Sequence, residues 1–513
     1  MRFLCSLTLA VLALAAPLHA QSALGPLRVF PPNPRYFTDG SGRAIYLAGS
    51  HNWHNFIDNG HRMAGTSDPP PVFDYNGYLD LLQSRHLNFF RLWRWEVPKW
   101  IDVQPPGEIH FAAQYPWLRT GPGAAADGKP RFDLTRFDPD YFARMRSRIV
   151  AARDRGIYVS VMLFDGSILQ YNAWPYHPFS AGNNVNGVHA GSAAYYGANL
   201  RFLWFLPGKL GEVLDSDNDL RVRNLQEAYV RKVVDTVNDL DNVLFELCNE
   251  TDASATHWQY ELIRYLKAYE ASKPKQHPVG MTFEFPDGSN DALFDSPADW
   301  ISPGPGDASG NYRDDPPERY RGKVVVSDTD HLWGHERGDR IWVWKSFTRG
   351  LNLLFMDELT PSPTWQDSAR DAMSQAEQWA KKIGLSRMIP LGALSETGYC
   401  LADRGREYLV FQPGNEGEFR LDLTDAPGWF QVEWFDVGRS LSLQGPAVRG
   451  GKRVKFTTPF GGPAVLYLKA TPPPPRQTGG HARTRLPRHP EWRQTAFRHA
   501  QLCRAGSAGR RTN

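Results

Sequence analysis

Two acidic segments, each directly after an apolar run, carry the side chains best suited to catalysis. Asn249 and Glu250 follow the run Asn242–Cys248, and Asp328 and Asp330 follow another such run. A carboxylic acid with an amide beside it, at the end of a buried strand, suits proton delivery to a glycosidic oxygen. Glycoside hydrolysis also needs a second carboxyl group on the other side of the scissile bond. We therefore predict that Glu250 is the acid/base and that Asn249 binds a sugar hydroxyl.

The sequence leaves the identity of the second carboxyl group open. Asp328 is the predicted nucleophile, and the alternatives are Asp330, Glu358 and Glu284. A carboxyl separation of roughly 5–5.5 Å goes with retention of configuration and roughly 6.5–9.5 Å with inversion. If none of these acids is a nucleophile, the protein is an inverting enzyme or a non-catalytic carbohydrate- or matrix-binding protein.

Other polar and aromatic residues at the ends of predicted strands are expected to contact the substrate or orient the acids. Arg91 is expected to keep the nucleophile ionised, because a neighbouring arginine lowers the pKa of a carboxyl group. The remaining predicted substrate-binding residues are His51, Trp53, Asp165, His331 and Trp333. His51 and the segment 328–331 lack the compact spacing of a standard metal motif, so we expect no metal and no cofactor.

Eight short apolar runs are expected to be the strands that position these residues. They span residues 44–50, 87–93, 156–164, 242–248, 279–283, 300–302, 323–327 and 351–356. Apolar residues recur at helical spacing between 141 and 150 and between 225 and 237. This alternation predicts a (β/α)₈ TIM barrel over residues 21–391, an α/β fold whose chemistry lies at the carboxyl ends of the strands.

The segments outside this alternation have distinct compositions. Two long insertions, 96–136 and 166–218, follow the second and third strands and are expected to wall a substrate cleft. After residue 391, short β-type runs separated by Gly, Pro and Asp predict an antiparallel β-sandwich domain over 392–470. Residues 471–513, rich in Pro and Arg, predict a disordered tail.

Residues 1–20 have the features of a signal peptide, with Arg2 before an apolar stretch. We therefore expect a protein secreted to the periplasm or beyond the cell, without a membrane span. The tail holds nine Arg and one Glu, a net charge of +8, so the remaining residues carry −5 of the formal +3. A mildly acidic body with 13% aromatic residues argues against a nucleic-acid partner and favours a polysaccharide or oligosaccharide.

Several segments resemble secreted bacterial barrel proteins related to the apiosidase-like and cellulase-like glycosidases of clan A. They are 36–53, 183–187, 327–334, 344–357 and 399–410, and 418–468 resembles the collagen-binding-type β-sandwich module of such proteins. The resemblance implies a retaining glycoside hydrolase in which Glu250, at the end of the fourth strand, is the acid/base. Asp328 stands where the clan has a nucleophilic Glu, and Arg91 resembles the clan's Arg that orients it.

Overall fold

The computed structural model describes most of the chain. The described residues are 23–59, 67–103, 106–167, 173–191, 216–308, 310–334, 337–357, 359, 364–414, 417–473 and 494–495. The predicted signal peptide and most of the predicted tail lie outside them. Within the described residues, no helix is long and apolar enough to cross a bilayer.

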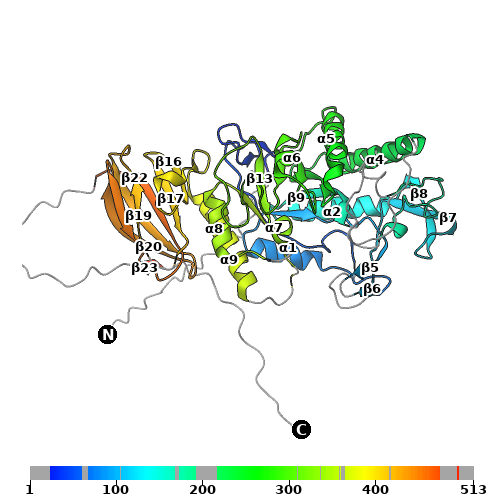
Figure 1. Cartoon of the computed structure of the whole chain (residues 1–513), viewed down its shortest axis with the longest axis horizontal. Coiled ribbons are helices and arrows are strands. Elements are labelled where there is room, and N and C mark those ends of the chain that lie inside the picture. The colour runs from blue at the N-terminus through cyan, green and yellow to red at the C-terminus, as the bar shows by residue number, and fades with distance from the viewer. Residues whose placement is uncertain are drawn as a thin grey trace, which may run out of the picture.

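Eight parallel strands close into a barrel, as the sequence predicts (Figure 1). In barrel order they are β3 (Ala48–His51), β4 (Phe89–Leu92), β9 (Tyr158–Asp165), β10 (Val243–Asn249), β11 (Val279–Thr282), β12 (Trp300–Ser302), β13 (Val324–Asp328) and β14 (Asn352–Met356). Every residue of these strands is buried, because side chains fill the barrel on one face and helices cover the other.

Helices follow most of the strands and cover the barrel. They are α1 (Tyr75–Ser84), α2 (Pro139–Arg153), α4 (Ser216–Val237), α5 (Thr256–Glu270), α6 (Asn290–Asp295), α7 (Thr329–Trp333), α8 (Arg340–Thr348) and α9 (Thr364–Lys382). The helical periodicities seen at 141–150 and 225–237 fall inside α2 and α4. The TIM-barrel prediction is therefore confirmed.

The N-terminal segment closes the amino-terminal end of the barrel. Its two short strands, β1 (Arg28–Val29) and β2 (Phe37–Thr38), pair antiparallel. Phe37 packs in one buried cluster with barrel residues that include Trp300. Gly280 makes room for the Trp300 ring, because a Cβ at Gly280 would lie 1.9 Å from it. With this end filled, the polar residues concentrate at the other end.

The first insertion folds into two β-hairpins rather than an irregular loop. Its strands are β5 (Lys99–Val103), β6 (Pro106–Phe111), β7 (Trp117–Ala124) and β8 (Pro130–Phe137). The second insertion, described over 173–191 and including the short helix η2 (Trp174–Tyr176), packs against it. The amide nitrogens of Phe132 and Val185 donate to the carbonyl oxygens of Asn183 and Phe132, each at 2.8 Å. The two insertions thus form one layer beside the barrel.

A seven-stranded antiparallel sheet forms the C-terminal region. In sheet order its strands are β15 (Ile389–Pro390), β16 (Cys400–Asp403), β17 (Glu407–Gln412), β22 (Ala464–Thr471), β19 (Trp429–Asp436), β20 (Leu441–Arg449) and β23 (Gln494–Thr495). A second sheet of β18 (Glu418–Asp422) and β21 (Arg453–Thr457) covers one face. The β-sandwich prediction is confirmed.

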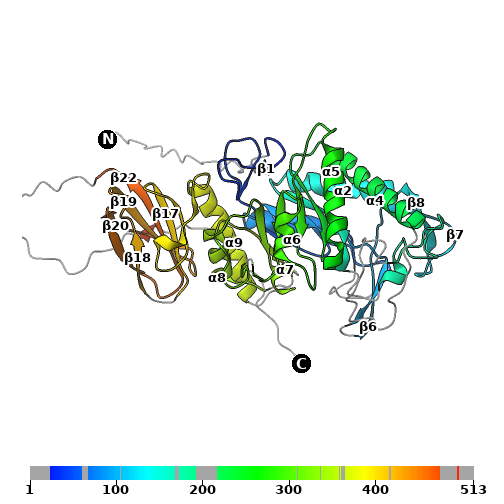
Figure 2. The ribbon, with the colours of Figure 1, turned by 45° about the horizontal axis from the view of Figure 1, so that its top comes forward.

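The other face of the large sheet packs on α8 and α9 of the barrel. The Trp344 ring lies 6.1 Å from Phe411, and the Trp379 ring lies 5.6 Å from Phe435 and 5.5 Å from Tyr467. These rings belong to the same buried cluster as the barrel core. Both views show the sheet beside α8 and α9, at the opposite end of the molecule from β7 and β8 (Figure 2).

Candidate active site

Five barrel strands bring predicted site residues to the carboxyl-terminal end of the barrel. These residues are His51 on β3, Arg91 on β4, Asp165 on β9, Asn249 on β10 and Asp328 on β13. All five are fully or almost fully buried. Hydrogen bonds join these five predicted residues into one connected network.

The Arg91 guanidinium is the centre of this network. Its Nε and Nη2 donate to the two carboxylate oxygens of Glu246 at 2.7 and 2.6 Å. Nη2 also donates to Oδ1 of Asn249 at 2.5 Å. Nη1 donates to Oδ2 of Asp328 at 3.1 Å and to Oδ2 of Asp330 at 2.9 Å. One buried cation therefore positions acceptors from the ends of strands four and seven.

Both oxygens of Asp328 are occupied. Oδ1 accepts from the backbone amide of Asp330 at 3.0 Å, which caps α7, and from Nε2 of His51 at 3.1 Å. Oδ2 accepts from Arg91. Burial alone would raise the pKa of Asp328, but His51 and Arg91 outweigh it and hold that pKa well below its usual range. Asp328 is thus ionised and fully enclosed.

Asp330 differs from Asp328 in the direction of its pKa shift and in its exposure. Burial and the neighbouring Asp328 charge raise the pKa of Asp330, against the opposing effect of Arg91. Its side chain is 5% exposed, whereas that of Asp328 is 0% exposed. The surroundings of Asp330 thus favour its protonated form more than an exposed site would, whereas the cations around Asp328 favour its ionised form.

His331 is a neutral imidazole that donates to Asn249. Burial and Arg91 lower its pKa to about 3. Nε2 lies 3.2 Å from Oδ1 of Asn249, an acceptor, and Nδ1 lies 2.7 Å from the hydroxyl of Ser302. The proton is therefore on Nε2, and Ser302 donates to Nδ1. Arg91 and His331 together fix the orientation of the Asn249 amide.

A second buried network joins the first through Asn249 and Asp165. Nδ2 of Asn249 donates to Oδ1 of Asp165 at 3.4 Å. The amide of Asp165 donates to Glu96 at 2.8 Å, and the other oxygen of Glu96 lies 3.0 Å from Nε2 of His177. Burial and the Glu96 charge raise the pKa of Asp165 to about 7. Because Glu96 and His177 belong to the two insertions, these insertions are tied directly to the site.

Glu250 lies directly after β10, half-buried, with a backbone φ of 43°. A non-glycine residue with positive φ is uncommon, and such conformations concentrate at functional sites. In this conformation the chain turns sharply after Asn249 and leaves Glu250 at the end of the strand. This backbone geometry distinguishes Glu250 from an ordinary residue at the end of a strand.

The predicted aromatic residues differ in their surroundings. Trp53 is buried in the barrel core, and its carbonyl oxygen accepts from the indole of Trp95 at 2.9 Å. Trp333 is half-buried at the end of α7, with its ring 5.8 Å from that of Trp342. Glu358, an alternative second acid, lies outside the described residues.

His51, Asp328 and Asp330 each offer a possible metal ligand, and the three ligand atoms lie within 4.8 Å of one another. Arg91 Nη1, however, donates to both aspartates. The guanidinium thus already supplies, at the same two carboxylates, the positive charge that a metal ion would bring. The geometry therefore fits an ion-pair network better than a metal centre.

Glu284, after β11, is a buried acid in a network that contacts the turn after Glu250. Gln259 donates from Nε2 to Oε1 of Glu284 at 2.8 Å and to Oγ1 of Thr251 at 2.9 Å. The Thr256 hydroxyl lies 2.7 Å from Oε2 of Glu284 and also 2.7 Å from the carbonyl oxygen of Ala253. One hydroxyl hydrogen cannot serve both oxygens, so a proton on Glu284 completes the network.

We expect Glu284→Gln to stabilise the protein increasingly as pH rises. Burial raises the pKa of Glu284 from 4.5 to about 8, against its hydrogen bonds. Between these values the unfolded chain loses this proton while the native state keeps it, so wild-type stability falls as pH rises through that window. Each unit of difference between the pKa in the native state and that in the unfolded state changes the free energy of unfolding by about 1.4 kcal/mol. Urea unfolding at pH 5, 6.5 and 8 measures the widening difference.

Glu261 on α5 supplies the control, because Glu261→Gln removes only exposed pairs with Arg223 and His257 and should stay within about 1 kcal/mol of the wild type at every pH. Parallel stability curves for Glu284→Gln and the wild type would contradict a protonated Glu284.

Glu246, Glu96, His177 and Ser302 belong to these networks, but the sequence did not single them out. The one signal was Glu246, a charged residue inside the apolar run of β10. A charge at a buried strand position requires a partner, which here is Arg91 on another strand.

Comparison with known proteins bears on the fold. Residues 108–297 match the family model of a domain of unknown function, DUF6298. No curated protein sequence matches significantly. The structure is similar to a family 5 glycoside hydrolase from Bacteroides vulgatus, with TM-score 0.54, 12% identity, and 88% of this chain and 95% of that chain covered. It is also similar to a structure described as a glycoside hydrolase, with TM-score 0.54, 12% identity, and coverage of 88% and 99%. At these identities the likeness shows the fold alone: the chain shares the barrel fold of these proteins.

Proposed function

We propose that the chain is a secreted glycoside hydrolase that cleaves O-glycosidic bonds of a polysaccharide or its side chains with retention of configuration. The observation that carries the proposal is the Arg91 network, which holds Asn249 on strand four and the two aspartates after strand seven at one end of the barrel. The fold likeness supports the proposal, and the apolar stretch after Arg2 supports secretion.

In the proposed mechanism Glu250 protonates the leaving oxygen while Asp328 attacks the anomeric carbon. Glu250 then removes a proton from the water that hydrolyses the glycosyl intermediate. Arg91 and His51 favour the ionised Asp328 that attack requires. Asn249, whose amide is oriented by Arg91 and His331, would bind a sugar hydroxyl beside the reacting carbon.

Asp330 is the alternative nucleophile. Its side chain is the more exposed of the two, and no described residue donates a hydrogen bond to its Oδ1. The lowered pKa of Asp328 suits a nucleophile, whereas the greater exposure of Asp330 suits contact with a substrate. The two assignments therefore predict different mutants as the inactive one.

We expect Asp328→Asn to lose activity by orders of magnitude and Asp330→Asn to lose less, because the amide cannot form the glycosyl intermediate. In the truncated variants Asp328→Ala and Asp330→Ala, azide can enter the space of the missing carboxylate and should restore turnover only where the nucleophile has been removed. The measurement is product release from glycans active with the wild type, with the exposed Asp287→Asn as control. Azide rescue of Asp330→Ala alone would reassign the nucleophile.

The overall proposal is tested by incubating the wild type with a panel of polysaccharides and following the anomeric signals of new reducing ends by NMR. A first-formed product with the configuration of the substrate supports retention. The enclosure of Asp328 favours a second candidate, a carbohydrate-binding protein on a non-catalytic barrel. Saturable glycan binding without any product, in the same panel, would select that candidate.

A further inference from the structure

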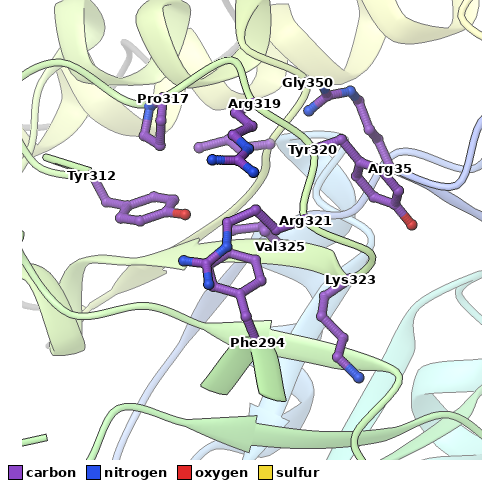
Figure 3. A pocket seen from close by; sticks show the side chains of 11 residues that line it. Arg35, Phe294, Tyr312, Pro317, Arg319, Tyr320, Arg321, Lys323, Val325 and Gly350 are labelled. Atoms are coloured by element: carbon purple, nitrogen blue, oxygen red, sulfur yellow. The ribbon is translucent and has the colours of Figure 1, made fainter. Parts of the chain in front are cut away.

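A hollow on the outside of the barrel gathers four cationic side chains against aromatic walls (Figure 3). Its empty volume, including the part open to solvent, is about 270 Å³. The cations are Arg35, Arg319, Arg321 and Lys323, and the walls include Phe294, Tyr312 and Tyr320. Figure 3 shows Arg319 above Arg321 and Phe294, with Tyr312 beside them. No carboxylate lines this hollow among the described residues.

Contacts with the surrounding protein hold three of the four cations in place. Arg35 donates to the carbonyl oxygen of Glu318 at 2.5 Å. Arg321 pairs with Asp291 at 2.6 Å and lies over the Phe294 ring at 4.2 Å. These contacts use only part of each guanidinium, which has five N–H donors. The remaining donors are therefore pre-positioned for a ligand.

The other two lining cations are Lys323, which is half-buried, and Arg319, which is exposed. The Lys323 ammonium donates to the carbonyl oxygens of Ser296 and Ala298 at 2.8 and 2.6 Å. Burial lowers the pKa of Lys323, so an added negative charge nearby would stabilise its ionised form. Arg319 is exposed at the rim, and no hydrogen bond or ion pair links it to another described residue. It is thus available to close over a bound group.

The nearby carboxylates offset only part of this positive charge. Glu318 directs its carboxylate to Arg349 and to the amide of Gly392, each at 2.8 Å. Asp299 pairs with Lys267 at 2.7 Å. Because both acids are committed to partners outside the hollow, Asp291 is the acid that bonds to a lining cation. Four cations beside low-dielectric ring faces favour a negative ligand.

The hollow is separate from the candidate active site. Lys323 and Val325 lie at the beginning of β13, whereas Asp328 lies at its end. At about 3.3 Å per residue, the five residues of β13 separate these ends by roughly 13 Å. A ligand in this hollow would therefore be distinct from the sugar that would meet Glu250 at the other end of the barrel.

We propose that this hollow binds a compact oxyanion, a phosphate, sulfate or carboxylate group, carried by a small molecule or by a charged sugar. Arg35 and Arg321 form a pre-positioned base and Arg319 closes the rim, while Lys323 lines the hollow with its ammonium held by Ser296 and Ala298. Bidentate guanidinium geometry suits all three oxyanions. The proposal does not depend on the chain's being a glycosidase.

The test is titration calorimetry of the full chain with inorganic phosphate, inorganic sulfate and glucuronate in separate arms at one ionic strength. At least one of these probes should bind saturably at one site, and Arg319→Glu should weaken it by tenfold or more. Arg313→Glu is the matched control, since Arg313 is exposed, bonds to Asp314 and does not line the hollow. It changes the net charge equally and should leave the affinity within about twofold.

The probe that binds most tightly shows which oxyanion the hollow prefers: a phosphate, a sulfate or the carboxylate of a charged sugar. Thermal unfolding of Arg319→Glu should match that of the wild type, because its side chain has no described partner to lose. Absence of saturable binding for all three probes would overturn the proposal. Equal losses of affinity in Arg319→Glu and Arg313→Glu would also overturn it, since the effect would then be one of net charge.

Discussion

Glu250→Gln should lower kcat/KM by about 10²–10⁴-fold, the range that a positioned proton donor contributes. Glutamine keeps the size of the side chain but can neither protonate the leaving oxygen nor activate water. The loss should be smallest for substrates with acidic leaving groups, such as nitrophenyl glycosides, because these need little protonation. Initial rates on a natural glycan and on an activated glycoside measure this difference.

The control for Glu250→Gln is Glu261→Gln, which alters an exposed acid outside the site. Unfolding midpoints should show that both variants fold. Near wild-type turnover of Glu250→Gln on the natural glycan would remove Glu250 as the acid/base. An equal loss on both substrates would point to a role other than proton transfer.

Replacement of Arg91 by methionine should destabilise the protein by about 3–5 kcal/mol, the usual cost of breaking a buried ion pair from one side. The change leaves Glu246, Asp328 and Asp330 buried without their shared cation. Since whole domains are stable by only about 5–15 kcal/mol, this loss is a large part of the total. Urea unfolding at neutral pH measures it.

A double-mutant cycle separates the charge effect from packing. Arg91→Met with Glu246→Leu removes both partners of the bidentate pair and should recover part of the lost stability. Arg155→Met, which breaks the exposed pair with Asp80, should cost less than about 1 kcal/mol. If Arg91→Met cost as little as Arg155→Met, the network would not be the stabilising centre that its geometry indicates.

The barrel could be predicted from the sequence because its strands are buried on both faces. Runs such as 156–164 and 242–248 are almost continuously apolar, so they stand out against the polar connections. The edge region of the second domain was harder to predict. The strand β20 (Leu441–Arg449) is partly exposed along its length and contains Gly445, and no apolar run marks it.

The site was predictable only as a set of strand ends. Arg91, Asn249 and Asp328 each follow or end an apolar run, so parallel strands would bring them to one edge. The contacts among these side chains depend on closure of the barrel, and no local sequence pattern predicts them. Glu246 shows this limit: its position within a strand is visible in the sequence, but its partner lies 155 residues away.

The large C-terminal sheet is covered on both faces, by β18 and β21 on one side and by Trp344 and Trp379 of the barrel helices on the other. Modules that are exchanged freely between enzymes are joined by linkers and few contacts. Here the sheet shares a continuous core with the barrel. A chimera with the β-sandwich of another protein would therefore leave the indole rings of Trp344 and Trp379 without their packing partners. This second domain is thus part of the scaffold of the barrel rather than an interchangeable attachment.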